Sequence, residues 1–493
     1  MSTTVVSSPG KVLVAGGYLV LDPAYSGIVV STSSRFYTVI QPTAASSHAN
    51  QIQVLSPQFT QASWRYDVTV EPKLTVVPNQ ENSSKNKFVH LALESAILLA
   101  TEMKGSSSVL SALAAGLDIT IAGDNDFYSQ RAKLAELNLP RNLESLTKIP
   151  PFAPTGGSLA QVHKTGLGSS AALITSLVSA LLVHFSVISS ADLSEDSEGR
   201  HLAHNLAQYV HCLAQGKVGS GFDVAAAVFG SHLYTRFDPS VLEDLMTGDT
   251  TSPRTLFPTL SPKNRAWNHK IRPFALPPLT RIMLADVDAG SDTPSLVGKV
   301  LKWRKENDAE AHALWTSIDQ LNQSFASILT RISELHDRDP AVYSAAVKYL
   351  SSLQPVQWMA NPWTPPEEED IMTAFYDAHQ TSEAIRAKMR EMGRLSGVPI
   401  EPSEQTKLLD ECVRQAGVIG GGVPGAGGFD AIWLLVCDPV DCSPDQRPTE
   451  RIEYVWSHYG SVSPLMAVES KAKGSRTENI DDIMGLKDTL RLS

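Results

Sequence analysis

Apolar runs and helix-like repeats alternate along the chain, which predicts strands and helices within the same domain. Residues 12–22 (VLVAGGYLVLD) and 26–40 are mostly apolar and are separated by a short turn, so we expect two buried strands. Residues 87–103 repeat apolar side chains at helical spacing, and Asn86 is placed to cap that helix. The alternation over residues 117–123 predicts a further strand.

Polar segments separate these elements and are expected to be loops. Residues 41–63 are rich in Ser, Gln and Ala, and residues 124–156 hold charges and prolines. A short strand is expected at 158–164, followed by a loop and a helix from about residue 169. Residues 202–215 repeat apolar positions as a second helix would.

The composition changes between residues 238 and 277, where Pro, Thr, Ser and Asp are frequent, as in a linker. We therefore expect an α+β chain of two domains, residues 1–240 and 275–493. The elements expected after the linker are a strand at 281–290, helices to about 350, a proline-rich loop at 352–370, helices at 371–416, and a glycine loop entering a strand at 419–437.

Composition narrows the range of partners. The chain has 493 residues, 42% hydrophobic and 19% charged, and a net charge of −11, which argues against a nucleic acid or an anionic membrane as partner. Four cysteines without a C-x-x-C pair suggest reduced thiols. We see no secretory signal and no membrane span, so we expect a cytoplasmic protein, either a monomer or a homodimer.

A glycine- and serine-rich stretch precedes one predicted helix: Gly166, Leu167, Gly168, Ser169, Ser170 and Ala171. Free N–H groups at a helix start favour phosphate. A dinucleotide-binding turn would need an acidic residue about 20 positions further on, and residues 183–191 contain none. A phosphate loop of another kind and a plain capped core helix both stay open on this stretch alone.

Three further clusters are candidates for chemistry. A Pro-Gly turn is expected to deliver Lys11 to the start of a buried strand, although an isolated lysine is usually a surface residue. Asp223 precedes the apolar run VAAAVF and is either a helix N-cap or a cleft carboxylate. Residues 417–428 contain seven of the chain's 31 glycines, more than a turn needs, which indicates close backbone packing against a ligand.

Histidines at three positions of one predicted helix suggest a metal site at first sight. His201, His204 and His211 share a helix face, and Cys212 is adjacent. No carboxylate or further cysteine completes the set at metal-ligand spacing, so zinc is not favoured.

Taken in order, these clusters resemble the signature of the GHMP small-molecule kinases, which include galactokinase and the homoserine, mevalonate and phosphomevalonate kinases. Within the superfamily the details most resemble the fungal type of phosphomevalonate kinases, since Val224 follows Asp223 and Asp430 follows the glycines. The segments that carry the resemblance are PGKVLVAGGYLVL (9–21), KTGLGSSAA (164–172), GKVGSGFDVA (216–225) and GVPGAGGFDA (422–431).

The resemblance implies an N-terminal domain like ribosomal protein S5 domain 2 and a ferredoxin-like C-terminal domain. It implies phosphoryl transfer from ATP, with Mg²⁺, to (R)-5-phosphomevalonate in the mevalonate route to isoprenoids and sterols. The implied catalytic residues are Lys11 and Asp223. The implied ATP-binding residues are Lys164, Gly166, Leu167, Gly168, Ser169, Ser170 and Ala171. The implied acceptor-binding residues are Gly17, Tyr18, Ser220, Gly425, Ala426, Gly427 and Gly428.

Two positions depart from the family pattern. Gly17 stands where a Glu is common, and Cys212 stands where mevalonate kinases have a magnesium-binding Glu, so only Ser170 is expected as a metal ligand. Extra contacts to the acceptor are expected from Lys217, Ser291 and Thr293. The rival readings are another kinase of the superfamily such as mevalonate kinase, a catalytically silent ligand-binding relative, and an NAD-dependent dehydrogenase.

Overall fold

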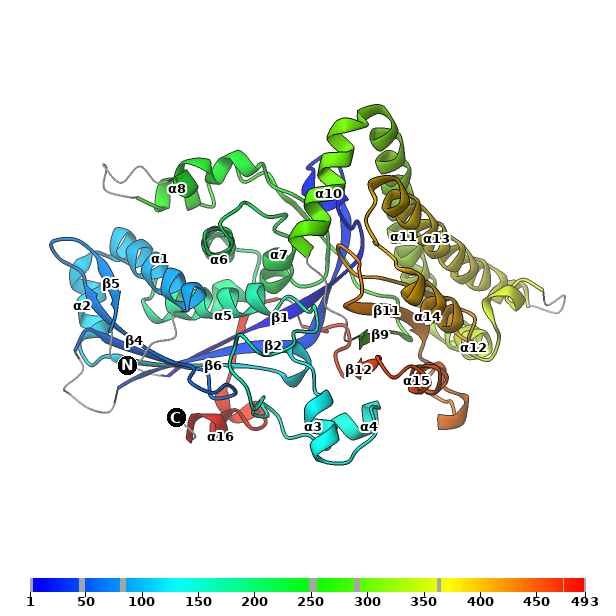
Figure 1. The fold of residues 1–493 in the computed structure, drawn as a ribbon, viewed down its shortest axis with the longest axis horizontal. Coiled ribbons are helices and arrows are strands. Elements are labelled where there is room, and N and C mark those ends of the chain that lie inside the picture. The colour runs from blue at the N-terminus through cyan, green and yellow to red at the C-terminus, as the bar shows by residue number, and fades with distance from the viewer. Residues whose placement is uncertain are drawn as a thin grey trace.

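Two β-sheets with helices packed on them form the frame of the molecule (Figure 1). The computed structural model describes residues 3–43, 49–79, 86–247, 255–287, 293–360, 365–472 and 474–491. Within these ranges the first sheet has nine strands, in the order β13-β1-β2-β6-β3-β4-β5, with β7 paired to β2 and β8 paired to β7. The second sheet, again within the described ranges, has four antiparallel strands in the order β10-β11-β9-β12.

The strands of the first sheet are β1 (Thr4–Ala15), β2 (Gly27–Pro42), β3 (Gln51–Leu55), β4 (Ser63–Thr69), β5 (Thr75–Pro78), β6 (Leu117–Gly123), β7 (His232–Thr235), β8 (Lys270–Pro273) and β13 (Arg476–Thr477). Those of the second sheet are β9 (Thr280–Asp286), β10 (Val418–Gly422), β11 (Ala431–Cys437) and β12 (Ser463–Leu465). The expected α+β class is confirmed.

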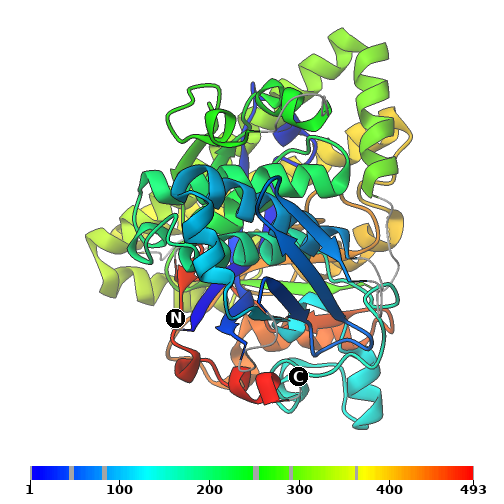
Figure 2. The ribbon, with the colours of Figure 1, turned by 90° about the vertical axis from the view of Figure 1, so that its left-hand side faces the viewer.

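Helices cover one face of the first sheet and bury its main core. They are α1 (Lys87–Lys104), α5 (Ser169–His184), α6 (Glu198–Gln215) and α7 (Phe222–Phe229), and Figures 1 and 2 show them on one side of the strands. On the other side, the short α16 (Leu486–Arg491) packs Leu486 near Val5 and Tyr37. The remaining helices near this sheet are α2 (Ser106–Leu113), α3 (Arg131–Glu136), α4 (Leu143–Leu146), α8 (Glu243–Thr247) and α9 (Phe257–Leu260).

Two long helices accompany the second sheet. Figure 1 shows α11 (Asp308–Arg338) and α13 (Pro366–Ser396) running side by side, and α13 also contacts β10. The other helices of this part are α10 (Thr293–Glu306), α12 (Pro340–Ser351), α14 (Ser403–Val413) and α15 (Pro448–Ser457). Among the residues that the structure describes, no helix is long and apolar enough to cross a membrane.

Several sequence predictions are confirmed because their apolar patterns are long. The helix expected at 87–103 is α1, and Asn86 Oδ1 accepts a hydrogen bond from Val89 N at 3.2 Å as its cap. The helices expected from residue 169 and at 202–215 are α5 and α6. The strands expected at 117–123 and 281–290 are β6 and β9, although β9 ends at Asp286.

Other predictions are wrong where tertiary pairing decides the structure. The first strand ends at Ala15 rather than at residue 22, because the chain turns at Gly16, whose φ of 97° favours glycine. The segment expected as a loop at 41–63 contains β3, whose side chains alternate between buried and half-buried. The strand expected at 158–164 is mainly a turn with a single bridge at Lys164.

The last described segment returns to the first sheet. Strand β13 pairs antiparallel with β1, with Val6 opposite Thr477 and Ser7 opposite Arg476. Glu478 accepts a hydrogen bond from Ser7 Oγ at 2.6 Å and ion-pairs with Arg476. The domain limits 1–240 and 275–493 stay a prediction. The strand β13, from the second of these ranges, belongs to the first sheet.

Candidate active site

The glycine- and serine-rich stretch forms a loop that caps α5. Gly166 and Gly168 have φ angles of 80° and 76°, which favour glycine, and Gly168 is the N-cap. Lys11 N donates to Leu167 O at 2.9 Å, so the loop is bonded to β1. Ser169 and Ser170 are the first two residues of α5 and are half-buried, where the N–H groups of a helix start favour an anion.

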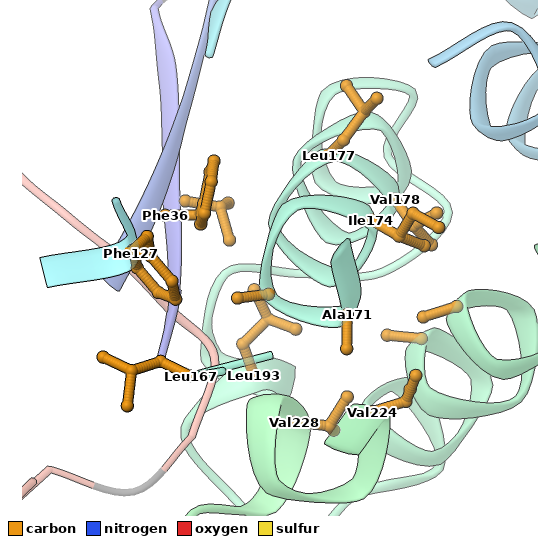
Figure 3. Close-up of a cluster of buried hydrophobic side chains, with 14 of the residues drawn as sticks. Phe36, Phe127, Leu167, Ala171, Ile174, Leu177, Val178, Leu193, Val224 and Val228 are labelled. Carbon is orange, nitrogen blue, oxygen red and sulfur yellow. The ribbon is translucent and has the colours of Figure 1, made fainter. Parts of the chain in front are cut away.

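The inner side of this loop is anchored in the core. Figure 3 shows Ala171, at the start of α5, pointing toward Val224 and Val228 of α7. Leu167 and Ala171 are buried, as are both valines. Because these side chains are small, the starts of α5 and α7 approach each other closely, and this packing places Ser170 and Asp223 at one site.

Lys11 lies within β1 rather than at its start. The expected Pro-Gly turn is wrong: the strand continues through Pro9 and Gly10 with a bulge before Lys11. The bulge aims the side chain at the loop before α5, where Nζ donates to Gly166 O at 2.9 Å. Nζ also lies 5.4 Å from the centre of the Phe222 ring. Burial lowers the pKa of Lys11 from its ordinary value, and the Asp223 carboxylate opposes that shift.

Asp223 is the second residue of α7, so the N-cap interpretation is wrong. The N-cap is Gly221, with φ 85°, and Asp223 Oδ1 accepts from Val224 N at 2.9 Å. The side chain is 21% exposed. The interpretation of Asp223 as a cleft carboxylate stays a prediction.

His211 joins the two groups that the sequence placed at this site. Its Nε2 lies 3.2 Å from Ser170 Oγ, 3.8 Å from Asp223 Oδ2 and 3.0 Å from Gln215 Nε2. The sequence interpretation considered His211 only together with His201 and His204, whose rings instead lie near His269. One signal in the sequence could have indicated His211: it lies near the end of α6, the helix that leads into the loop before Asp223.

The donor set fits magnesium. A hydroxyl at Ser170 and a carboxylate at Asp223 are hard oxygen donors, which Mg²⁺ prefers together with water and phosphate oxygens. Within the ranges that the structure covers, no group of three His, Cys, Asp or Glu side chains is arranged to hold a metal ion. Cys212 is buried and its thiol accepts hydrogen bonds from Gln208 Nε2, at 3.1 Å, and from Gly219 N.

A second cluster forms around Gly17 and the glycine loop after β10. Tyr18 OH donates to Ala426 O at 2.7 Å, and a Cβ added at Gly17 would collide with Gly425 O. Gly428 N donates to Ile400 O at 2.8 Å. Gly425 N donates to Leu13 O at 3.3 Å, so β1 links this cluster to Lys11.

The glycine loop is shorter than the sequence suggested. Gly420, Gly421 and Gly422 belong to β10, and only the glycines at 425, 427 and 428 lie in the loop with positive φ. Gly427 packs against Ile400 so closely that an added Cβ would collide with the Ile400 carbonyl oxygen.

The other predicted residues lie around these two clusters. Ser220 is half-buried and its carbonyl accepts from Tyr234 OH at 2.8 Å. Lys164 and Lys217 are exposed. Ser291 and the side chain of Thr293 lie outside the described residues.

Comparison with known proteins gives two family matches and several long relatives. The family model described as GHMP kinases N terminal domain matches residues 148–231, and the one described as GHMP kinases C terminal matches residues 372–460. The peroxisomal phosphomevalonate kinase of Arabidopsis thaliana is 39% identical over 455 residues, covering 87% of this chain and 89% of that protein. Phosphomevalonate kinase erg8 of Aspergillus fumigatus is 37% identical over 476 residues, covering 89% and 88%.

Solved structures agree with the fold. A Lin0012 protein from Listeria innocua superposes with a TM-score of 0.61 at 15% identity, covering 97% of this chain and 100% of that one. Streptococcus pneumoniae phosphomevalonate kinase in complex with phosphomevalonate and AMPPNP has a TM-score of 0.55 at 15% identity, covering 95% and 100%. The GHMP kinase fold expected from the resemblance is confirmed. With relatives this similar over most of its length, the chain belongs to the phosphomevalonate kinases of the GHMP kinase superfamily.

Proposed function

We propose that this chain transfers the γ-phosphoryl group of ATP to (R)-5-phosphomevalonate, with Lys11 and Asp223 at the centre of the reaction. The observation that carries this assignment is the contact of Lys11 Nζ with the phosphate loop, at 2.9 Å from Gly166 O. The kinship to phosphomevalonate kinases supports the substrate. The products are ADP and (R)-5-diphosphomevalonate.

The acceptor itself explains why a lysine is needed. A phosphomonoester has a second pKa of about 6 and is mostly dianionic at pH 7, so its oxygen is a nucleophile without a strong base. The obstacle is the repulsion between two polyanions. A cation held between the acceptor phosphate and the γ-phosphate offsets that repulsion most when the transferring group is between them. Lys11 is proposed for this position.

Asp223 is proposed to keep Lys11 charged and oriented. Burial favours the neutral amine of Lys11, whereas the carboxylate favours the ammonium form. Asp223 can also orient a magnesium-bound water. Removing a proton from the acceptor is a minor task for it, because the acceptor is already ionised.

The α5 side of the site is proposed to hold the nucleotide. The loop Gly166–Ala171 offers backbone N–H groups to the ATP phosphates, and Lys164 lies at its entrance. Ser170 Oγ would hold Mg²⁺, which supplies positive charge to the phosphates when bound. Gln215 Nε2 lies 3.0 Å from His211 Nε2, which fits a ring nitrogen that accepts hydrogen bonds. His211 Nε2 then accepts a hydrogen bond from the Ser170 hydroxyl, and the lone pairs of that hydroxyl stay free for the metal.

The opposite side is proposed to bind the acceptor. Its residues are Gly17, Tyr18, Ser220, Gly425, Ala426, Gly427 and Gly428. The close packing of Gly17 on the glycine loop leaves no room for side chains there, which suits a backbone-lined pocket for a small anion.

For the cell, we propose a cytoplasmic enzyme that is a monomer or a homodimer. All four cysteines are free and three are buried, as in a reducing compartment. The Arabidopsis relative is named as peroxisomal, so fluorescence microscopy of a tagged chain is the direct test of the compartment. Light scattering during gel filtration determines the assembly.

An ADP-release assay with phosphomevalonate and mevalonate side by side tests the reaction. We expect Mg²⁺-dependent turnover with phosphomevalonate and little with mevalonate. Lys11→Met and Asp223→Ala should each lower kcat on the order of 10²-fold or more, because each removes charge stabilisation at the reacting groups. Lys263→Met is the control, since Lys263 is an exposed lysine paired with Glu198.

Wild-type turnover with mevalonate alone would overturn the substrate assignment. Near wild-type kcat in both Lys11→Met and Asp223→Ala, with unchanged thermal unfolding, would overturn the roles of these residues.

A further inference from the structure

A buried arginine ties together two loops of the acceptor side. Arg236 follows β7 directly and is 8% exposed. Its NH1 donates to Leu21 O at 2.6 Å, and its NH2 donates to Val218 O at 3.0 Å and to Gly219 O at 2.6 Å. One guanidinium therefore bonds two segments that are far apart in the sequence, because its fork of donors spans several acceptors.

Both segments lead directly into residues proposed to line the acceptor pocket. Leu21 ends the short 3-10 helix Leu19–Leu21, which follows Gly17 and Tyr18. Gly219 precedes Ser220, and Asp223 lies three residues beyond. Arg236 thus fixes the spacing between the two strips of backbone without touching the pocket residues themselves.

The same strand holds the loop at a third carbonyl. Tyr234 OH donates to Ser220 O at 2.8 Å, so Arg236 and Tyr234 together bond three consecutive carbonyls. The next residue is also fitted to this strand, since a Cβ on Gly221 would lie 2.8 Å from Tyr234 OH. These contacts leave the loop one position on β7.

The bonded carbonyls also determine where the loop presents its N–H groups. In a trans peptide the N–H points opposite to the C=O of the same unit. With the carbonyls of Val218 and Gly219 drawn to Arg236, the N–H groups of Gly219 and Ser220 point away from it. Gly219 N–H accordingly donates to Cys212 Sγ. Carbonyl oxygens, which repel anions, are held on the side of Arg236.

We propose that Arg236 is a positioning residue for the acceptor: it holds the loop 218–223 against the segment after Tyr18, and so sets the affinity for phosphomevalonate. This inference rests on the proposed function. Tyr234 is proposed to assist through Ser220. Neither side chain is proposed to contact the substrate.

The test separates positioning from mere folding by comparing Michaelis constants. Arg236→Lys keeps the charge, but its donors sit on a single nitrogen and cannot span the separated carbonyls that NH1 and NH2 of the arginine reach. We expect the KM for phosphomevalonate to rise about tenfold or more, a loss comparable to that of one or more hydrogen bonds to a charged group. The KM for ATP should change less than about threefold, because the nucleotide loop does not touch Arg236. Tyr234→Phe should shift the same KM in the same direction but by less.

Arg200→Lys is the matched control. Arg200 is also a buried arginine, 5% exposed, and its NE and NH2 both donate to Val228 O, away from the loop 218–223. It should lower thermal stability by a similar amount while leaving both KM values unchanged.

The outcomes are distinct. An inactive wild-type chain refutes the proposed function. An active wild type whose Arg236→Lys and Tyr234→Phe variants keep the wild-type KM for phosphomevalonate refutes the positioning role. A rise of both KM values together, or an equal rise in Arg200→Lys, also refutes it, because a general loss of stability would then explain the effect. If Arg236→Lys does not fold, Tyr234→Phe decides alone, since its ring stays buried.

Discussion

At the scale of the residue, His211 connects Ser170, on the proposed nucleotide side of the site, with Asp223, the proposed catalytic carboxylate. Its ring nitrogen lies within 3.2 Å of Ser170 Oγ and 3.8 Å of Asp223 Oδ2. The ring is 5% exposed, so little solvent can substitute for it. A hydroxyl that is to bind a metal through oxygen needs an acceptor for its proton, and His211 is placed to be that acceptor.

His211→Ala should therefore lower kcat about 10- to 100-fold, because it leaves the half-buried Ser170 hydroxyl without its acceptor. His211→Gln should recover part of the loss, since the amide can reach the same position. Steady-state kinetics and thermal melting of both variants check this. His201→Gln is the control on the same helix, where the ring contacts Asp196 near the surface. Equal kcat for wild type and His211→Ala would contradict the assignment.

Residue roles could be predicted from the sequence only where several unusual residues stand together. Lys11, Asp223 and the glycines each stand inside a motif segment with other unusual residues, so the sequence predicts a role for each of them, and these roles stay predictions. His211 and Arg236 stand alone, and only the packing of α6 and β7 brings them to Ser170 and to the loop 218–223. The sequence showed that Cys212 departs from the family pattern, but its role as a hydrogen-bond acceptor depends on the path of the loop 218–223.

At the scale of the element, close packing of backbone on backbone shapes the acceptor side. Gly17, two residues after β1, and Gly427, after β10, both lie where an added Cβ would meet a carbonyl oxygen. Such positions hold two segments at one fixed distance. The Gly17 contact is with Gly425, so it couples the first sheet to the second.

Gly17→Ala should push the glycine loop away from β1. We expect the KM for phosphomevalonate to rise about tenfold and the free energy of unfolding to fall by about 1–3 kcal/mol, as for an overpacked site. Gly298→Ala in α10 is the control, because nothing lies within 4 Å of its added Cβ, and it should be neutral or stabilising by up to about 1 kcal/mol. Kinetics and urea unfolding measure both; an unaltered KM in Gly17→Ala would contradict the packing argument.

Long elements could be predicted from the sequence and short ones could not. The apolar repeats of α1, α5 and α6 extend over several turns, so the periodicity outweighs local exceptions. Strand β3 has five residues and exists because β4 and β6 pair with it on both sides. The segment 158–164 has a similar pattern but, among the described residues, forms a single isolated bridge, between Lys164 and Tyr128.

At the scale of the whole molecule, charged side chains join the two halves near the phosphate loop. Asp286, at the end of β9, is 1% exposed and lies 3.1 Å from His163 Nε2 and 3.4 Å from Arg131 Nε. His163 stands three residues before Gly166. The second sheet is thus bonded to the segment that leads into the proposed nucleotide loop.

Buried and half-buried histidines should make the stability of the molecule depend on pH. Loss of solvent lowers the pKa of His232 and His269 to about 4, and lowers that of His204 well below its ordinary value. Each is neutral in the folded chain at pH 7, whereas in the unfolded chain it takes up a proton near pH 6.5. The stabilisation is complete above pH 6.5 and is lost as the pH falls toward 4, by on the order of 2 kcal/mol per histidine between pH 7 and 5.

Buried carboxyl groups change the pH dependence of stability in the opposite direction, since burial raises the pKa of Asp124 to about 7. The measurement therefore compares the wild type with a variant that lacks one histidine. The ring centroids of His269 and His204 lie 4.6 Å apart, and His269→Phe keeps an aromatic ring at that position. Between pH 7 and 5 this variant should lose on the order of 2 kcal/mol less unfolding free energy than the wild type. Identical pH profiles for the two proteins in urea unfolding would contradict the prediction.

The return of the chain to β1 has a consequence for synthesis on the ribosome. The strand that carries Lys11 is synthesised long before its outer neighbour, Arg476–Thr477, and before Glu478, to which its Ser7 hydroxyl bonds. Contacts of such sequence separation form late, since the whole intervening loop must close. Until then the edge of β1 that later pairs with β13 is free. The nascent chain must therefore keep this edge from pairing with other chains while its remaining residues are synthesised.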